Sequence, residues 1–271
     1  ALAMIWTTRQ RSEGAGALED FEEGQGSVVV LIHGVGLKAE AWNAVSPLLS
    51  DRYRVLCVDM PGHGGSALQG SHELAEFTAR LGVFIEALEG PVCLAGHSMG
   101  ALLAVELAAA LPQKIAAIAA LNMVYGRSAQ AAQAVQARAS ALAKTAAVAP
   151  GPTLSRWFGD APTGADEKAA VACRAWLTET DPKGYAAAYR LFARHDGPSE
   201  DTLARISCPA LFMTGAADPN STPALSQALA ARTHSLSHVV PKAAHMMPMT
   251  HGQAVAEQLR AHFNATHSPK T

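Results

Sequence analysis

The chain contains little charge, and its charge is balanced between the two signs. Only 16% of its 271 residues are charged, and 21 Lys and Arg against 23 Asp and Glu leave a formal net charge of −2. This balance gives no basic patch for nucleic acid and no polybasic segment for a membrane surface. Long apolar runs are also missing: a spanning helix needs about 18 uncharged apolar residues, and the most apolar stretch, 101–111, contains Glu106. We therefore expect neither a nucleic-acid partner nor a membrane.

Cysteine is scarce and follows no ligand or disulfide pattern. The four cysteines stand at positions 57, 93, 173 and 208 without a CxxC pair, and three lie in or beside apolar runs. Buried thiols in a reducing cytoplasm account for this pattern. The first residues show no basic region followed by a long apolar one, so we expect no signal peptide and a cytoplasmic location. With no HExxH pair and no Cys/His cluster of zinc spacing, we predict no metal and no cofactor.

What the chain does have is apolar residues, 49% of the total, in two alternating patterns. Short continuous β-branched runs predict strands buried on both faces, as in a parallel sheet. Helical stretches separate them, and this alternation is typical of a doubly wound α/β protein. The expected strands span 28–32, 53–58, 92–95, 115–121, 210–214 and 236–240. The expected helices span 41–49, 73–88, 98–111, 222–231 and 252–263.

The middle of the chain differs from both ends. Residues 126–200 contain no buried strand pattern, only Ala-rich helical segments separated by Pro and Gly. The expected helices there span 129–148, 154–158, 166–178 and 183–194. We interpret 126–200 as a helical insertion into a core formed by 1–125 and 201–271.

The pentapeptide Gly96-His97-Ser98-Met99-Gly100 matches G-x-S-x-G. It follows an expected strand and opens an expected helix, which is the context that a nucleophilic serine elbow requires. Glycine two residues to either side allows the backbone to pack closely, so that Ser98 can hold a strained conformation and expose its hydroxyl. The alternative is a plain turn with a serine between two glycines. Such a turn would not require a strand before it and a helix after it.

A nucleophilic serine needs a base, and eleven histidines compete for that role. His245 lies between the last expected strand and the last expected helix, where a base can meet the serine. His238 falls inside the strand, and His251 stands at a helix start, where a capping role serves as well. For the acid, Asp218 follows the strand 210–214 at its carboxyl end, the edge where sites in open α/β sheets form. Its alternative is a turn residue before Pro219.

A third group of residues could stabilise negative charge. His33-Gly34-Val35-Gly36 directly follows the first expected buried strand. The backbone N–H groups of Val35 and of Met99 are the candidate donors to a developing oxyanion, against the alternative of a plain Gly turn. Gly34 and His97 are then expected to line the substrate pocket. From the aromatic residues of 126–200 we assign Trp157 to the pocket, whereas packing within the insertion would explain most of the others.

These motifs together resemble those of the α/β-hydrolase fold superfamily. They are His33–Gly36, Asp59-Met-Pro-Gly-His-Gly-Gly-Ser66, Gly96–Gly100, Gly215–Asp218 and Ala244-His245. The run His33–Trp42 resembles pimeloyl-acyl carrier protein methyl ester esterases, and the size and insertion resemble 3-oxoadipate enol-lactonases. The resemblance implies an eight-stranded, mostly parallel sheet flanked by helices, with an antiparallel second strand. It places the first two strands near 4–10 and 18–23, and it makes 126–200 a lid.

The resemblance implies a serine hydrolase that cleaves a carboxylic ester or lactone of a small molecule through Ser98, His245 and Asp218. Ser98 disfavours dehalogenases and epoxide hydrolases of this fold, which use an Asp nucleophile. Some relatives carry the acid after the sixth strand, where this chain has Asn122. A carbon–carbon bond hydrolase with the same triad and a non-catalytic ligand receptor remain alternatives.

The charge of the insertion gives a hint about the substrate. Residues 126–200 carry nine Lys and Arg against seven acids. This excess favours an acidic small molecule or an acidic carrier, although solvated helix faces produce the same count. No sequence feature sets the oligomeric state.

Overall fold

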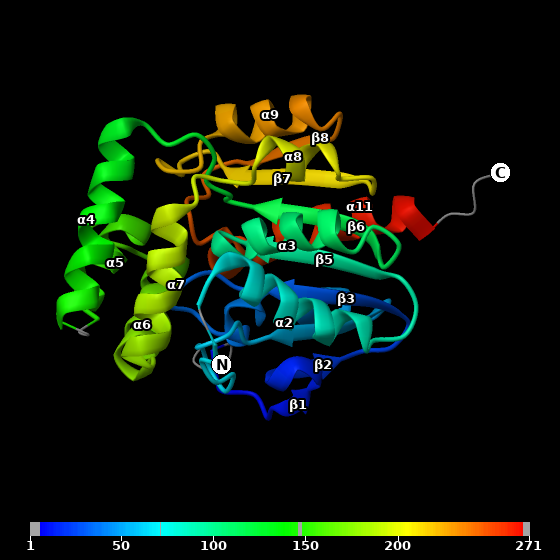
Figure 1. Cartoon of the computed structure of the whole chain (residues 1–271), viewed down its shortest axis with the longest axis horizontal. Helices are drawn as coiled ribbons and strands as arrows, with labels where there is room; N and C mark the ends of the chain where they lie inside the picture. The colour runs from blue at the N-terminus through cyan, green and yellow to red at the C-terminus, as the bar shows by residue number, and fades with distance from the viewer. Residues whose placement is uncertain (1–5, 71, 146–147, 268–271) are drawn as a thin grey trace.

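The computed structural model describes residues 6–70, 72–145 and 148–267. Within them one sheet of eight strands runs through the molecule in the order β1-β2-β4-β3-β5-β6-β7-β8 (Figure 1). The pairs of β2 with β1 and with β4 are antiparallel, and the other pairs are parallel. The expected mostly parallel sheet is confirmed. The strands are β1 (Ser12–Gly14), β2 (Leu18–Glu23), β3 (Ser27–Ile32), β4 (Tyr53–Val58), β5 (Val92–His97), β6 (Ile115–Leu121), β7 (Ala210–Gly215) and β8 (Leu236–Val240).

Helices cover both faces of this sheet, which explains the continuous apolar strands. In β3, Val29 and Val30 are both fully buried but belong to different apolar clusters, one on each face. One cluster includes side chains from α2, α3, α8 and α9, and the other from α1 and α11. Figure 1 shows α2 and α3 in front of the sheet and α11 behind it. These helices are α1 (Ser46–Leu49), α2 (Leu74–Glu86), α3 (Met99–Ala110), α8 (Glu200–Ala204), α9 (Pro223–Arg232) and α11 (Gly252–His267).

Four further helices lie together beside one end of the sheet (Figure 1). They are α4 (Ala129–Thr145), α5 (Pro150–Phe158), α6 (Ala165–Glu179) and α7 (Pro182–Arg194). They share a third apolar cluster that includes Leu177, Tyr185 and Tyr189. The expected all-helical character of this segment agrees with the structure, whereas the boundary of a lid at 126–200 and of a core at 1–125 and 201–271 stays a prediction. No helix in the described part of the chain is long and apolar enough to cross a membrane.

Two local expectations were wrong. Residues 41–49 form no single helix; they divide between the 3-10 helix η3 (Ala39–Trp42) and α1. Pro47 lies in the first turn of α1, and a proline fits there but not inside a longer helix. The first strand is Ser12–Gly14, not 4–10; residues 4 and 5 lie outside the described residues. The Arg9 N–H, which a strand would use in the sheet, instead donates to the Glu40 carboxylate at 2.8 Å.

Candidate active site

Ser98 stands at the sharp turn between β5 and α3. Its backbone has φ 56° and ψ −115°, a strained combination for a residue with a side chain. The flanking glycines permit this turn, because a Cβ at Gly96 would lie 2.0 Å from the Gly100 carbonyl oxygen. A Cβ at Gly100 would lie 2.3 Å from the Ile32 carbonyl oxygen. The turn leaves Ser98 half-buried at the carboxyl edge of the sheet and facing a cavity.

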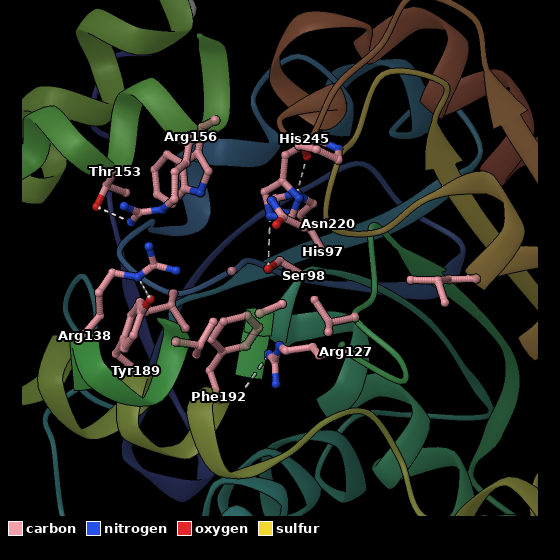
Figure 2. A pocket seen from close by; sticks show the side chains of 18 of the residues that line it. His97, Ser98, Arg127, Arg138, Thr153, Arg156, Tyr189, Phe192, Asn220 and His245 are labelled. Atoms are coloured by element: carbon pink, nitrogen blue, oxygen red, sulfur yellow. Dashed lines mark hydrogen bonds between the residues drawn. The ribbon is translucent and has the colours of Figure 1, made fainter. Parts of the chain in front are cut away.

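His245 and Asp218 meet Ser98 at this edge from distant parts of the sequence. His245 lies in the loop between β8 and α10 (Met247–Thr250). Its Nε2 is 3.2 Å from Ser98 Oγ, and its Nδ1 is 2.8 Å from Asp218 Oδ2. Figure 2 shows the Ser98 hydroxyl directed at the His245 ring. The chain thus brings the three expected residues into one hydrogen-bonded series.

Asp218 is held as an ionised acceptor. Its Oδ1 accepts the N–H groups of Asn220 at 2.9 Å and Ser221 at 3.1 Å, and its Oδ2 accepts the Asn122 amide at 2.8 Å. Burial acts to raise the pKa of Asp218, but the interaction with His245 and these hydrogen bonds outweigh it, and the pKa is lowered. An ionised Asp218 is only an acceptor, so His245 donates through Nδ1–H and its Nε2 is free to accept the Ser98 proton.

Two neighbouring residues hold Asp218 and His245 in place. Asn122, at the end of β6, occupies the place where some relatives carry an acid, and here it donates to the acid instead. His97 donates its Nε2–H to the His245 carbonyl oxygen at 2.7 Å. Burial, together with the charge of His245, lowers the pKa of His97 to about 3, so this ring is neutral at physiological pH. Sequence reasoning singled out both positions but did not predict these bonds.

The two alternative histidines, and two acids near the end of the insertion, make other contacts. Asp196 and Glu200, the other acids near the end of the insertion, bond to Arg127 and to Tyr125 and Arg232 respectively. His238 is half-buried in β8, and His251 bonds through its Nδ1 to the Thr250 hydroxyl. In the part of the chain that the structure describes, no group of three or more His, Cys, Asp or Glu side chains could hold a metal ion.

The expected oxyanion donors flank Ser98. A Cβ at Gly34 would lie 3.1 Å from Ser98 Cβ, so the loop 33–36 passes directly beside Ser98. Met99 is the first residue of α3, and an N–H in the first turn has no partner within its helix. The roles of Val35 and Met99 in holding an oxyanion stay predictions.

The cavity in front of Ser98 has a volume of about 260 Å³. The expected pocket residues Gly34, His97 and Trp157 all line it; their contact with substrate stays a prediction. Three arginines also line it, and no Asp or Glu does among the described residues. Sequence reasoning counted these cations but did not distinguish them from the surface ones. They are Arg127 before α4, Arg138 on α4 and Arg156 on α5.

The three arginines differ in what they bind. Arg127 lies over the Phe192 ring and bonds to the Asp196 carboxylate and two backbone carbonyls. Arg138 donates Nε–H to the Tyr189 hydroxyl at 2.8 Å, and Arg156 donates to the Thr153 hydroxyl at 3.0 Å. Neither of these two forms an ion pair within the described residues.

Arg138 and Arg156 lie close enough to repel each other. Burial lowers the pKa of Arg156, and the charge of Arg138 lowers it further. Figure 2 shows both guanidinium groups on the same side of the pocket. The two therefore form a region of uncompensated positive charge in the pocket that contains Ser98.

The whole chain was compared with known proteins. The family model described as "Alpha/beta hydrolase family" matches residues 29–258. The (E)-2-((N-methylformamido)methylene)succinate hydrolase of Acinetobacter baylyi is 38% identical over 266 residues, covering 97% of this chain and all of the relative. The pimeloyl-[acyl-carrier protein] methyl ester esterase of Methylococcus capsulatus is 38% identical over 103 residues, which cover 38% of each chain.

A solved structure shows the same fold. The esterase of Thermogutta terrifontis, with malate bound, superposes with a TM-score of 0.83 at 24% identity, covering 96% of this chain and all of that one. The expected resemblance and the expected hydrolase class are confirmed. This chain belongs to the alpha/beta hydrolase family.

Proposed function

We propose that the protein hydrolyses an acyl bond in a small substrate that carries two carboxylate groups, with Ser98 as nucleophile. The observation that carries the proposal is the pair Arg138 and Arg156 in a cavity lined by Ser98 and, among the described residues, by no acidic side chain. Arginine binds carboxylates through parallel N–H donors. A dicarboxylate would neutralise both guanidinium groups and remove their mutual repulsion.

The chemistry follows from the hydrogen-bonded series. His245 takes the proton of Ser98 through Nε2 as Oγ attacks the carbonyl carbon, while Asp218 stabilises the imidazolium that forms. The Val35 and Met99 N–H groups hold the oxyanion. His245 then protonates the leaving group, and water, activated by the same histidine, hydrolyses the acyl-enzyme. The same steps serve an ester, a lactone and an amide whose nitrogen leaves as an enamine.

The full-length relative supports the substrate class. Its name describes a succinate that bears an N-methylformamidomethylene group, and succinate contributes two carboxylates. A substituted succinate of this kind is therefore the first compound to test, followed by esters and lactones of dicarboxylic acids. The acidic-carrier alternative is less well supported, because the arginine pair lies inside the pocket and not on an outer surface.

The test compares charged and uncharged substrates in two arginine variants. Arg156→Gln and Arg138→Gln are expected to lower kcat/KM for the dicarboxylate about 10- to 100-fold, the scale of one charged hydrogen bond. Hydrolysis of p-nitrophenyl acetate is expected to stay within about threefold of the parent. Arg174→Gln, at an exposed position of α6 outside the pocket lining, is the matched control.

Three results would contradict the proposal. Equal losses for charged and uncharged substrates would show that the arginines only support the fold. Labelling by a fluorophosphonate at a residue other than Ser98 would refute the nucleophile. Cleavage of a vinylogous diketone without any ester, lactone or enamide hydrolysis would assign the protein to the carbon–carbon bond hydrolases.

A further inference from the structure

Two histidines outside the triad connect the loops beside the active site. The first loop, 33–38, follows β3 and carries Val35. The second loop, 59–66, follows β4 and contains the motif Asp59–Ser66, to which the triad gives no role. His33 is fully buried and His63 is 1% exposed. Each ring bonds to the backbone of the other loop, so the connection is reciprocal.

The two rings use every nitrogen. His33 donates Nδ1–H to the Gly34 carbonyl at 2.8 Å, and its Nε2 accepts the Met60 N–H at 3.0 Å. His63 donates Nδ1–H to the Pro61 carbonyl at 3.2 Å, and its Nε2 accepts the Gly36 N–H at 3.0 Å. A protonated imidazole has two donors and no acceptor, so this arrangement requires both rings to be neutral. Burial lowers the pKa of both, that of His33 to about 3.

The bond from His63 reaches the residue next to the expected oxyanion donor. The Val35 N–H and the Gly36 N–H belong to successive peptide groups that share the Val35 Cα. Holding the second group therefore restricts the orientation of the first. Gly36 has φ +76°, a conformation that glycine adopts freely. The Leu37 N–H donates to the Gly34 carbonyl at 3.3 Å, so this turn and the His63 ring together hold the loop.

Helices α6 and α7 pack closely against the same two loops. A Cβ at Gly36 would lie 2.7 Å from side-chain atoms of both Leu177 and Tyr185. A Cβ at Gly184, in the first turn of α7, would lie 1.9 Å from the Gly62 carbonyl oxygen. Both loops are thus in close contact with the helical segment, and His63 lies within the second loop between these contacts.

We infer that His63 is a positioning residue for the oxyanion hole, because its Nε2 holds the Gly36 N–H and thereby aims the Val35 N–H at the carbonyl oxygen of the substrate. His63 touches neither the substrate nor the reacting atoms. It also occupies the Gly36 N–H, so the oxyanion has two backbone donors and not three. This inference rests on the proposed function.

The test removes the acceptor and then restores it. His63→Leu has no acceptor, whereas His63→Gln places an amide oxygen near the former Nε2. Loss of a whole oxyanion donor costs about 10²- to 10³-fold in kcat, so a misaimed donor in His63→Leu is expected to lower kcat about 10- to 100-fold with little change in KM. His63→Gln is expected to recover most of kcat.

Binding of a transition-state analogue separates positioning from general damage. Affinity for a boronic acid, which forms a tetrahedral adduct on serine, is expected to fall in His63→Leu by the same factor as kcat/KM. Affinity for succinate as a carboxylate probe is expected to stay unchanged. The matched control is His262→Leu: His262 is also buried, but it lies on α11 and bonds to the Ile118 carbonyl of β6 and not to the loop that carries Val35. We expect the control to lose stability and keep kcat.

Several outcomes would overturn the inference. One is a His63→Leu enzyme with parental kcat and parental boronate affinity. Another is an equal fall in boronate and succinate affinity. If His63→Leu does not fold, His63→Met makes the same comparison, and ¹⁵N NMR of the parent tests the tautomer directly: a proton on Nε2 of His63 refutes the bond from Gly36. A parent that is not labelled by a fluorophosphonate would instead refute the proposed function.

Discussion

The two sides of the pocket differ in how completely their polar side chains are hydrogen-bonded. The strand side carries Asp218 and His245, and the helical side carries Arg138 and Arg156. On the strand side, Asp218 and His245 are tied by hydrogen bonds to each other, to Asn122, to His97 and to neighbouring backbone groups. On the helical side, Arg138 and Arg156 each donate one bond to a neutral hydroxyl and, among the described residues, have no ion pair. Under the proposed function, the strand side is therefore arranged for the reaction before substrate binds, whereas Arg138 and Arg156 gain their ionic partners from the substrate.

Ser98→Ala is expected to have the largest effect. It removes the Ser98 hydroxyl on the strand side and leaves the two arginines of the helical side unchanged. We expect kcat to fall about 10⁶-fold, the scale seen when a triad nucleophile is removed. The dissociation constant for the dicarboxylate should stay within a few-fold of the parental KM, and the unfolding temperature should change little. Steady-state kinetics and calorimetric titration make the measurement. Residual activity within tenfold of the parent would contradict the nucleophile assignment.

Asp218→Asn is expected to have the second largest effect. The variant keeps the shape but loses the ionised acceptor, so the His245 ring can adopt the wrong tautomer. A loss of about 10⁴-fold in kcat is the scale of this change in a serine protease triad. The loss should be equal for the dicarboxylate and for p-nitrophenyl acetate, in contrast to the arginine variants. A loss of activity confined to the dicarboxylate would contradict the assignment of reaction chemistry to the strand side and substrate charge recognition to the helical side.

Acid stability is the last comparison, because it depends on buried groups and not on the reacting atoms. The pKa values of His33 and His97 are each lowered to about 3, mainly by burial, whereas an unfolded histidine titrates near 6.5. Below pH 6.5 the unfolded chain therefore takes up protons that the folded protein refuses. Stability should fall from about pH 6.5 towards pH 3.

Two carboxyl groups oppose this fall. Burial raises the pKa of Asp20 to about 6 and also raises that of Glu106. The folded protein therefore binds these protons before the unfolded chain does, and the contribution of these two groups to stability rises as the pH drops below 6. Urea unfolding midpoints between pH 4 and 8 measure the sum, and Asp20→Asn should make the decline steeper. A midpoint independent of pH would show that the two histidines are solvated.

The sequence was informative wherever a local pattern determines local geometry. The strand before Ser98 and the helix after it, with Gly96 and Gly100, predict the elbow because no other residue fits those positions. The continuous apolar strands likewise predicted a sheet covered on both faces. The antiparallel direction of β2 was predicted from the family resemblance and not from a local sequence pattern.

What the sequence could not predict depends on contacts between distant segments. The nine cations of 126–200 are equivalent in sequence; only the packing of α4 against α7 and of α5 against α6 places Arg138 and Arg156 in the pocket. The Arg9 N–H bonds to Glu40, a residue 31 positions away, and not to a strand. The bond between His63 and Gly36 spans 27 residues, and nothing local marks it.

The paired arginines have a consequence for the end of the reaction. Hydrolysis of an acyl bond next to a dicarboxylate leaves both carboxylates on the product, so Arg138 and Arg156 hold product and substrate by the same groups. Under the proposed function, release of that product works against the charge that captured the substrate. We therefore expect the product to compete with substrate for the same two arginines, so that turnover slows as product accumulates.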